Sequence, residues 1–414
     1  MRIIVYSLVF FSVLIAVTVA AAVNSTESQW KHYTTTDGLS NDQIYSIAVD
    51  SSNNIWVGTF YDSNSPHDTG GINMFDGSAW KHYLTEDDET FVKAITSLIL
   101  DEDILWAGSI VSPGQGLIRY DISTNTSSVY RKDDKRVELW GNCITALAID
   151  NSNILWIGSW DCEGEGNTTG LSWFDYENNN WGPINPSAIP ELQDELATGG
   201  AIIAMDIDKD NNLWAILYNN GISRIIVIDV IKKKFKYKFD DTTDNLSLSA
   251  TTSLGVDRDG NIWVGSKEGL SQYNASQNKW IQNSYLTNTD LDMRNSQDSV
   301  STLSIDKEEN DIYLGIINVQ SGRIRLSSLN IDGKKVSLIS NEDTFSGSSY
   351  MIGAIKKDQE GVLWVATKNG IYTQTASPRA SLPENSEPQK QRTNGPGIFT
   401  SSDNNGCFLT VLAP

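Results

Sequence analysis

Two loops of this chain place aromatic side chains directly beside carboxylates, and one more aromatic residue lies upstream of the second loop. The residues concerned are Phe60, Tyr61, Asp62, His67, Asp68, Trp140, Trp160, Asp161, Glu163 and Glu165. Flat aromatic faces next to hydrogen-bond acceptors suit the binding of sugar rings or cationic groups. We therefore treat this set as a ligand-binding hypothesis. The alternative is that the two loops only pack on each other.

The residues available for catalysis are few. The chain has three histidines, and only His67 falls in one of these loops, since His32 and His82 belong to expected strands at the outer rim. No histidine pair has zinc spacing, and the sequence contains neither a nucleophile elbow nor a phosphate-binding glycine loop. We expect no catalytic residue, no metal and no cofactor. The alternative enzyme is a lyase with His67 as general base and loop carboxylates on a metal.

Two acidic segments resemble short calcium-binding loops. Asp206, Asp208 and Asp210 alternate with other residues, and Asp257 and Asp259 precede Gly260. Both runs stand just before a strand tryptophan, where this chain repeatedly uses Asp, Asn and Gly, and neither has the bidentate glutamate of an EF-hand loop. The pattern therefore favours turn formation over calcium binding.

Two of the three cysteines are placed to form a disulfide. Cys143 and Cys162 lie at similar distances from the expected turn at 151–153. In an antiparallel hairpin such residues face each other at a separation that a disulfide can span. We expect this bond in an oxidising compartment, with two free thiols as the alternative. Cys407 is left over.

A pentapeptide centred on an aromatic residue supplies the framework for these loops. It occurs seven times, and successive central residues are 50, 50, 58, 49, 50 and 51 positions apart. A unit of about fifty residues has the length of a four-stranded propeller blade. We predict an all-β fold, a seven-bladed β-propeller of four-stranded antiparallel blades over residues 30–375. The central residues are Trp56, Trp106, Trp156, Trp214, Trp263, Tyr313 and Trp364.

The seventh repeat has no outer strand of its own. The segment Trp30 to Tyr33 repeats the four residues Trp80 to Tyr83 of the first blade, yet it precedes the first complete unit. An N-terminal strand that completes the last blade would close the ring and cover an edge that could otherwise pair with other chains. We therefore predict that residues 30–36 form the outer strand of the last blade and close the ring.

The repeats resemble the two-component-regulator propeller family, whose pattern joins Asn-Ile-Trp-Val-Gly-Thr to a Gly-Leu pair and a Trp-x-x-Tyr strand. Blade one matches it best, from Asn54 to Thr59, at Gly71-Ile72 and from Trp80 to Tyr83. The resemblance implies an extracytoplasmic sensing or binding module. In that family such modules are usually attached to a signalling kinase, and because no kinase follows the propeller in this sequence we do not extend the resemblance to a signalling role.

Charge and flanking segments bear on partners and location. The net charge of -21 argues against nucleic acid, whose phosphates need a basic surface, and against contact of the propeller with anionic membranes. Residues 1–22 are typical of a signal peptide, with an uncleaved anchor as the alternative. Residues 376–414 are rich in Ser, Pro and Asn, as in a disordered linker and tail. We expect a monomer that is secreted, periplasmic or displayed on the cell surface.

The length of the loop after each pentapeptide differs between blades. From the central aromatic residue to the next strand glycine the distance is 15 residues in blade one and 14 in blade three, but 6 in blades five and seven. Insertions in repeat proteins collect on the binding face. We therefore expect an unidentified small ligand, a carbohydrate or a surface protein to bind over blades one to three. A protein-interaction scaffold is the alternative function.

Overall fold

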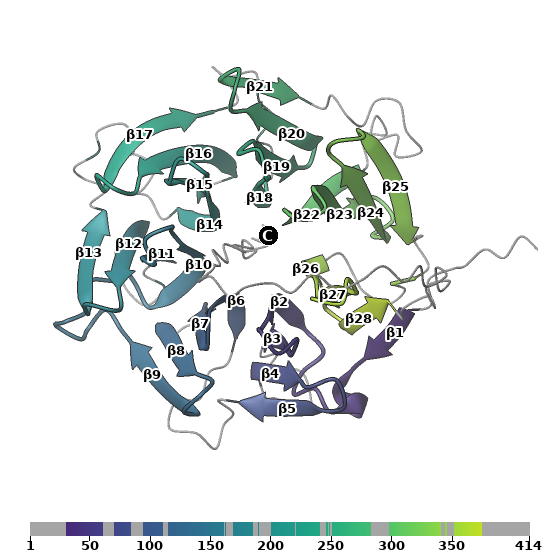
Figure 1. Ribbon diagram of the computed structural model, residues 1–414, viewed down its shortest axis with the longest axis horizontal. Helices are drawn as coiled ribbons and strands as arrows, with labels where there is room; N and C mark the ends of the chain where they lie inside the picture. Colours follow the sequence, from purple (N-terminus) through teal and green to yellow (C-terminus); the bar gives the residue numbers. More distant parts are fainter. Residues whose placement is uncertain are drawn as a thin grey trace, which may run out of the picture.

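Seven four-stranded antiparallel sheets surround a common axis in the computed structural model (Figure 1). The structure describes residues 30–60, 70–83, 94–110, 115–160, 162, 169–184, 189, 200–219, 221–240, 246, 248, 251–282, 298–340, 344–345 and 352–374. Within these ranges the one helical element is a 3-10 turn at Thr35–Asp37. The predicted seven-bladed β-propeller is confirmed.

Each blade runs from an inner strand at the axis to an outer strand at the rim (Figure 1). Blades one to three consist of β2 (Ile44–Val49), β3 (Ile55–Thr59), β4 (Gly71–Phe75) and β5 (Trp80–Tyr83); β6 (Ile95–Asp101), β7 (Ile104–Ser109), β8 (Leu117–Asp121) and β9 (Thr126–Tyr130); and β10 (Cys143–Ile149), β11 (Leu155–Trp160), β12 (Thr169–Asp175) and β13 (Asn180–Ile184). Blades four and five consist of β14 (Ala201–Ile207), β15 (Asn212–Asn219), β16 (Ile222–Asp229) and β17 (Lys234–Phe239); and β18 (Ser253–Val256), β19 (Ile262–Ser266), β20 (Gly269–Asn274) and β21 (Lys279–Gln282). Blades six and seven consist of β22 (Asp298–Asp306), β23 (Asp311–Asn318), β24 (Ile324–Asn330) and β25 (Lys335–Ser340); and β26 (Ile352–Lys357), β27 (Leu363–Thr367), β28 (Gly370–Gln374) and β1 (Trp30–Tyr33).

The N-terminal strand closes the ring, as predicted. β1 pairs antiparallel with β28, with Trp30 opposite Gln374 and Tyr33 opposite Ile371. The two strands lie side by side at the rim, purple against yellow in Figure 1. The strand is shorter than the expected segment 30–36, because the chain turns into the 3-10 helix after Thr34. Blade seven therefore contains strands from both ends of the described chain.

The hydrophobic core is divided among the seven boundaries between neighbouring blades. Each core cluster combines side chains from two adjacent sheets, for example Trp56 of blade one with Leu105 of blade two. The closing boundary has its own cluster, in which Tyr33 and Trp364 of blade seven meet Ile47 of blade one. Because each sheet is covered by a neighbour on both faces, its two central strands are largely buried, as β3 and β4 of blade one show.

The glycine of the repeated pentapeptide makes room for the next blade. A Cβ atom on Gly58 would lie 2.5 Å from a side-chain carbon of Ile95, and one on Gly158 would lie 2.8 Å from Ile202. Blade four has Ile216 in place of this glycine. The residue of blade five that corresponds to Ile95 and Ile202 is the smaller Thr251. Both Ile216 and Thr251 are buried, so a larger side chain in blade four is matched by a smaller one in blade five at this boundary.

A buried hydrogen bond joins the turn of most blades to the central tryptophan. In these blades an aspartate accepts the indole N–H of the tryptophan six residues later, across 2.8 or 2.9 Å. Blade two has a spacing of five between Asp101 and Trp106, and the buried indole nitrogen of Trp106 has no hydrogen-bond partner in the described part of the chain. The bonded pairs are Asp50 with Trp56, Asp150 with Trp156, Asp208 with Trp214, Asp257 with Trp263 and Asp358 with Trp364.

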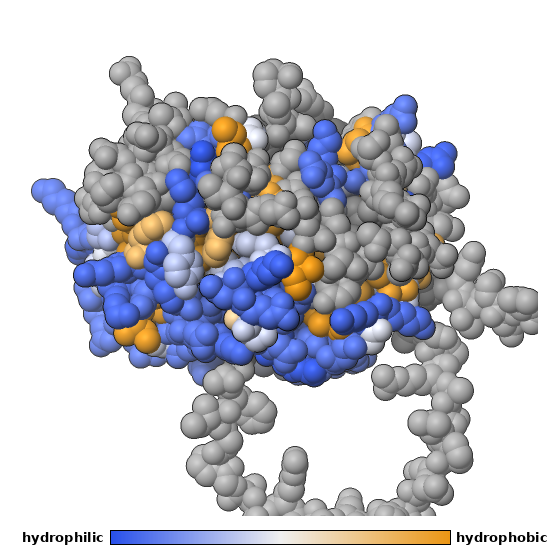
Figure 2. All heavy atoms as spheres, turned by 90° about the horizontal axis from the view of Figure 1, so that it is seen from above, coloured by the Kyte–Doolittle hydropathy of each residue, from blue (hydrophilic) through white to orange (hydrophobic). Residues whose placement is uncertain are grey.

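The described surface is mainly hydrophilic when the ring is seen edge-on (Figure 2). Hydrophobic side chains appear there as separate patches. Among the described residues the exposed large hydrophobic side chains are those of Ile222, Ile231, Tyr237, Val319 and Leu338. They come from blades four and six, and none of them comes from blades one to three, over which the sequence predicts ligand binding.

Candidate functional site

The structure describes three members of the predicted ligand-binding set. Phe60 follows the end of β3, Trp160 is the last residue of β11, and Trp140 precedes β10. Blade two separates Phe60 from Trp160 in the ring (Figure 1). The other predicted residues lie outside the described residues, namely Tyr61, Asp62, His67, Asp68, Asp161, Glu163 and Glu165.

Phe60 is held in place by its backbone and by a second aromatic ring. Its N–H donates to the carbonyl of Gln43 across 2.8 Å, and it forms an isolated β-bridge with Ala94 of blade two. Its ring packs against that of Tyr45, with centroids 5.1 Å apart. Both side chains are half-buried, so a described pair of rings stands at the end of β3.

Tyr45 was missing from the set predicted from the sequence. It lies at a β-bulge between Ile44 and Ser46, and bulges re-aim the side chain that they carry. Equivalent bulges occur in five other blades, and there the bulged residue is never aromatic. Alignment of the inner strands would have singled out Tyr45, since the other residues are Thr96, Thr145, Ile203, Ser301 and Gly353.

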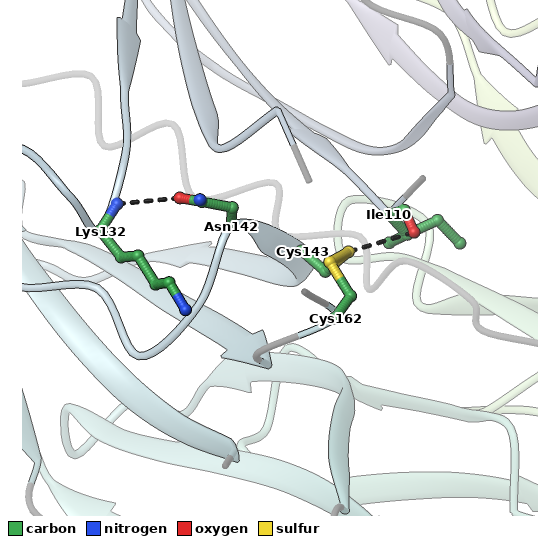
Figure 3. Close-up of a disulfide and its surroundings, with 5 residues drawn as sticks. All are labelled: Ile110, Lys132, Asn142, Cys143 and Cys162. Carbon is green, nitrogen blue, oxygen red and sulfur yellow. Dashed lines mark hydrogen bonds between the residues drawn. A yellow bond between two sulfur atoms is a disulfide. The ribbon is translucent and has the colours of Figure 1, made fainter. Parts of the chain in front are cut away.

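A disulfide fixes the chain just beyond Trp160. Cys143 and Cys162 are joined, with Cα atoms 5.9 Å apart (Figure 3). The direct strand partner of Cys143 is Trp160, because the bulge of β10 shifts the register that simple symmetry about the turn implies. Cys143 Sγ also lies 3.2 Å from the carbonyl oxygen of Ile110 in blade two. A disulfide sulfur has no proton to donate, so this is a packing contact between blades.

Trp140 and Trp160, the two tryptophans of the predicted ligand-binding set, differ in how their indole groups are used. Trp140 donates its Nε1–H to the carbonyl of Leu171 across 3.1 Å, and a Cβ on Gly170 would lie 2.1 Å from its ring. Trp140 therefore anchors the segment before β10 to β12. The indole nitrogen of Trp160 is buried and has no hydrogen-bond partner among the described residues.

The acidic runs form turns, in line with the sequence interpretation. Asp208 accepts the backbone N–H groups of Asp210 and Asn212 and the indole of Trp214. Asp206 instead accepts the N–H of Val256 in blade five across 2.8 Å. Across the described ranges no three His, Cys, Asp or Glu residues are grouped so that they could hold a metal ion.

Both described histidines form a hydrogen bond with a backbone carbonyl group. His32 Nε2 lies 2.5 Å from the carbonyl oxygen of Asn369, and His82 Nε2 lies 2.6 Å from that of Gly38. Each carbonyl accepts from the imidazole when the proton is on Nε2. His32 also stacks on Tyr372, with ring centroids 4.0 Å apart. Both histidines therefore support blade contacts at the rim.

Comparison with known proteins agrees with the repeat pattern. Residues 38–61 match the family model described as two component regulator propeller, which confirms the resemblance in the first blade. No curated protein matches the sequence. None of the helices in the described part of the chain has the length and apolar character required to cross a membrane.

Solved structures share the fold at low identity. The extracellular domain of a protein assigned as a hybrid two component system from B. thetaiotaomicron is 19% identical, with a TM-score of 0.60 over 84% of this chain and 42% of that chain. A domain of a one component system from the same organism is 18% identical, with a TM-score of 0.57 over 84% and 40%. Streptogramin B lyase is 12% identical, with a TM-score of 0.56 over 83% and 96%. The chain spans about two fifths of the length of the two extracellular domains.

Proposed function

We propose that this protein is a non-catalytic, extracytoplasmic propeller that binds or senses a ligand on the long-loop face over blades one to three. The observation that carries the proposal is the half-buried pair Tyr45 and Phe60 at the end of β3. Elsewhere in the described part of the ring, aromatic side chains gather mainly in the contacts between blades. A pair of rings beside a loop with further aromatic and acidic residues suits a ligand that stacks and accepts or donates hydrogen bonds.

The disulfide supports both the location and the site. A bond between Cys143 and Cys162 is stable in an oxidising compartment, which fits the export signal expected in residues 1–22. It also anchors the chain two residues beyond Trp160, which lowers the ordering cost of binding a ligand at this end of β11. The similar structures from B. thetaiotaomicron are extracellular domains, and this is a further reason for the assignment.

The proposal is tested with the protein from residue 23 onward on glycan and peptide arrays. A Tyr61→Ala/Trp160→Ala variant should lose binding to the ligand that the arrays reveal, while its melting temperature stays within a few degrees of the parent. Tyr237→Ala is the matched control, because Tyr237 is an exposed aromatic residue on the outer strand of blade four. Binding that survives in the double variant and is lost on substitution in blades five to seven would move the site to another sector.

The same experiment separates the alternative functions. Hits confined to folded proteins or peptides would favour an interaction scaffold over a small-ligand sensor. Turnover of a glycan or cyclic depsipeptide, abolished by His67→Ala, would establish the lyase instead.

A further inference from the structure

The outer strands of the seven blades differ in how their edges are protected. Each is the last strand of its sheet and so presents backbone N–H and C=O groups at the rim (Figure 1). Exposed edges pair with extended segments of other chains, and lysine or proline on an edge strand discourages this. In blades other than blade two the outer strand contains such a residue: Lys31, Lys81, Pro183, Lys234, Lys279 or Lys335.

β9 is the outer strand without such protection. Its sequence is Thr-Ser-Ser-Val-Tyr, with neither charge nor proline. Its register with β8 runs over five residue pairs without interruption, whereas bulges break the outer pairs of blades four and six. A regular, uncharged edge is the geometry that strand addition requires.

Packing of the side chains keeps β9 in position. Val129 packs against the core cluster shared with blade one, and Tyr130 lies against Trp181 of blade three, with ring centroids 5.4 Å apart. Thr126 and Ser128 are exposed. The strand is therefore held from both sides, and little ordering of β9 is needed when a partner strand arrives.

The segment after β9 carries positive charge in a strongly acidic chain. Residues 131–136 read Arg-Lys-Asp-Asp-Lys-Arg, whereas the whole chain has a net charge of -21. Arg136 pairs with Asp134 across 3.1 Å, while Arg131 and Lys135 are exposed. Carboxylates of an incoming chain would be attracted to this end of β9 and repelled by most of the remaining surface.

We propose that β9 accepts an extended, acidic peptide segment of a partner protein as a fifth strand of blade two. Backbone hydrogen bonds to β9 supply the affinity, and the acidic end of the segment lies beside Arg131 and Lys135. This surface is on the rim and is independent of the ligand site proposed on the long-loop face.

The test uses a fluorescent heptapeptide with two glutamates followed by alternating threonine and valine. Fluorescence anisotropy should show saturable binding that weakens with salt. A copy of the peptide with N-methyl groups on alternate residues should bind at least about tenfold more weakly, since it loses several backbone hydrogen bonds. An Arg131→Glu/Lys135→Glu variant should bind the parent peptide about fivefold more weakly. Lys335→Glu, on the outer strand of blade six, is the control and should bind normally.

Three outcomes would overturn the proposal. The first is that the unmodified protein does not bind the peptide. The second is that the methylated and unmethylated peptides bind equally, because the contact would then not involve strand pairing. The third is sedimentation that shows a dimer competing with the peptide at every concentration tested, because β9 would then be occupied by a second copy of the chain.

Discussion

Trp263 donates its indole N–H to Asp257 across 2.8 Å, and the two residues are six positions apart. The same carboxylate accepts the backbone N–H groups of Asp259 and Asn261. One aspartate therefore shapes the turn and binds the central aromatic residue of the next strand. Blade two lacks this arrangement, because its turn is one residue shorter, and the Trp106 indole finds no partner among the residues that the structure describes.

The hydrogen bond can be measured by comparing two substitutions of the same type. Trp263→Phe and Trp106→Phe remove equal volumes from buried positions, but only Trp263 loses a hydrogen bond. We expect Trp263→Phe to lower the free energy of unfolding by about 1–2 kcal/mol more than Trp106→Phe. Urea denaturation followed by tryptophan fluorescence measures both. Equal losses would mean that the indole bond adds nothing to stability.

The boundary between blades four and five predicts a compensating pair. Ile216→Gly should cost about 3–5 kcal/mol, because it opens a cavity where the isoleucine side chain is fully buried. Adding Thr251→Ile should restore much of that loss, since the double variant reproduces the glycine and isoleucine of other blades. A double-mutant cycle from urea denaturation should give a coupling of about 1–3 kcal/mol. Additive losses would show that the two side chains do not share this space.

An ion pair joins blade six to blade seven. Lys357 Nζ lies 2.5 Å from a carboxylate oxygen of Asp306 and 2.7 Å from one of Glu309. Burial alone would raise the pKa of Asp306, but the bond from Lys357 and the N–H of Glu309 outweigh it and hold the pKa below its usual value. Burial also acts to lower the pKa of Lys357, and its two carboxylate partners outweigh that effect and raise it.

These opposite shifts set the pH dependence of the ion pair. The depressed pKa of Asp306 means that its contribution is present above about pH 4 and is lost as the pH falls through the folded value. The raised pKa of Lys357 means that its contribution is complete below the usual lysine pKa. Lys357→Met should therefore lower the free energy of unfolding by about 1–3 kcal/mol between pH 5 and 9. The difference from the parent should shrink in urea titrations below pH 4, and a difference that stays constant there would exclude the ion pair as its source.

Ring closure rests on the buried side chain of Tyr33. Its ring lies 6.1 Å from that of Trp364 and 5.8 Å from that of Trp80, so it bridges the last blade and the first. Tyr33→Ala should cost about 3 kcal/mol, and a protein that starts at Leu39 should lose at least as much and melt less cooperatively. Thermal melting by circular dichroism measures both. A truncated protein that melts like the parent would show that β1 is not needed for closure.

The blades and their number could be predicted because the information is local and repeated. Each turn and strand signal recurs at a period of about fifty residues. The identical sequences of Trp30–Tyr33 and Trp80–Tyr83 were sufficient to place the closing strand. The pairing of Cys143 with Cys162 also followed from position along one hairpin. In each case the deciding residues are close in sequence or are copies of one unit.

The contacts that distinguish one blade from another were decided by the tertiary structure. Bulges in the inner strands shifted the partner of Cys143 to Trp160 and brought Tyr45 against Phe60. The repeat pattern of the sequence does not show where such an extra residue is inserted into a strand. Lys357 and Asp306 are 51 residues apart and meet only because consecutive sheets face each other around the axis. Repetition in the sequence thus determined the ring, whereas the register and packing between neighbouring sheets decided which side chains meet on it.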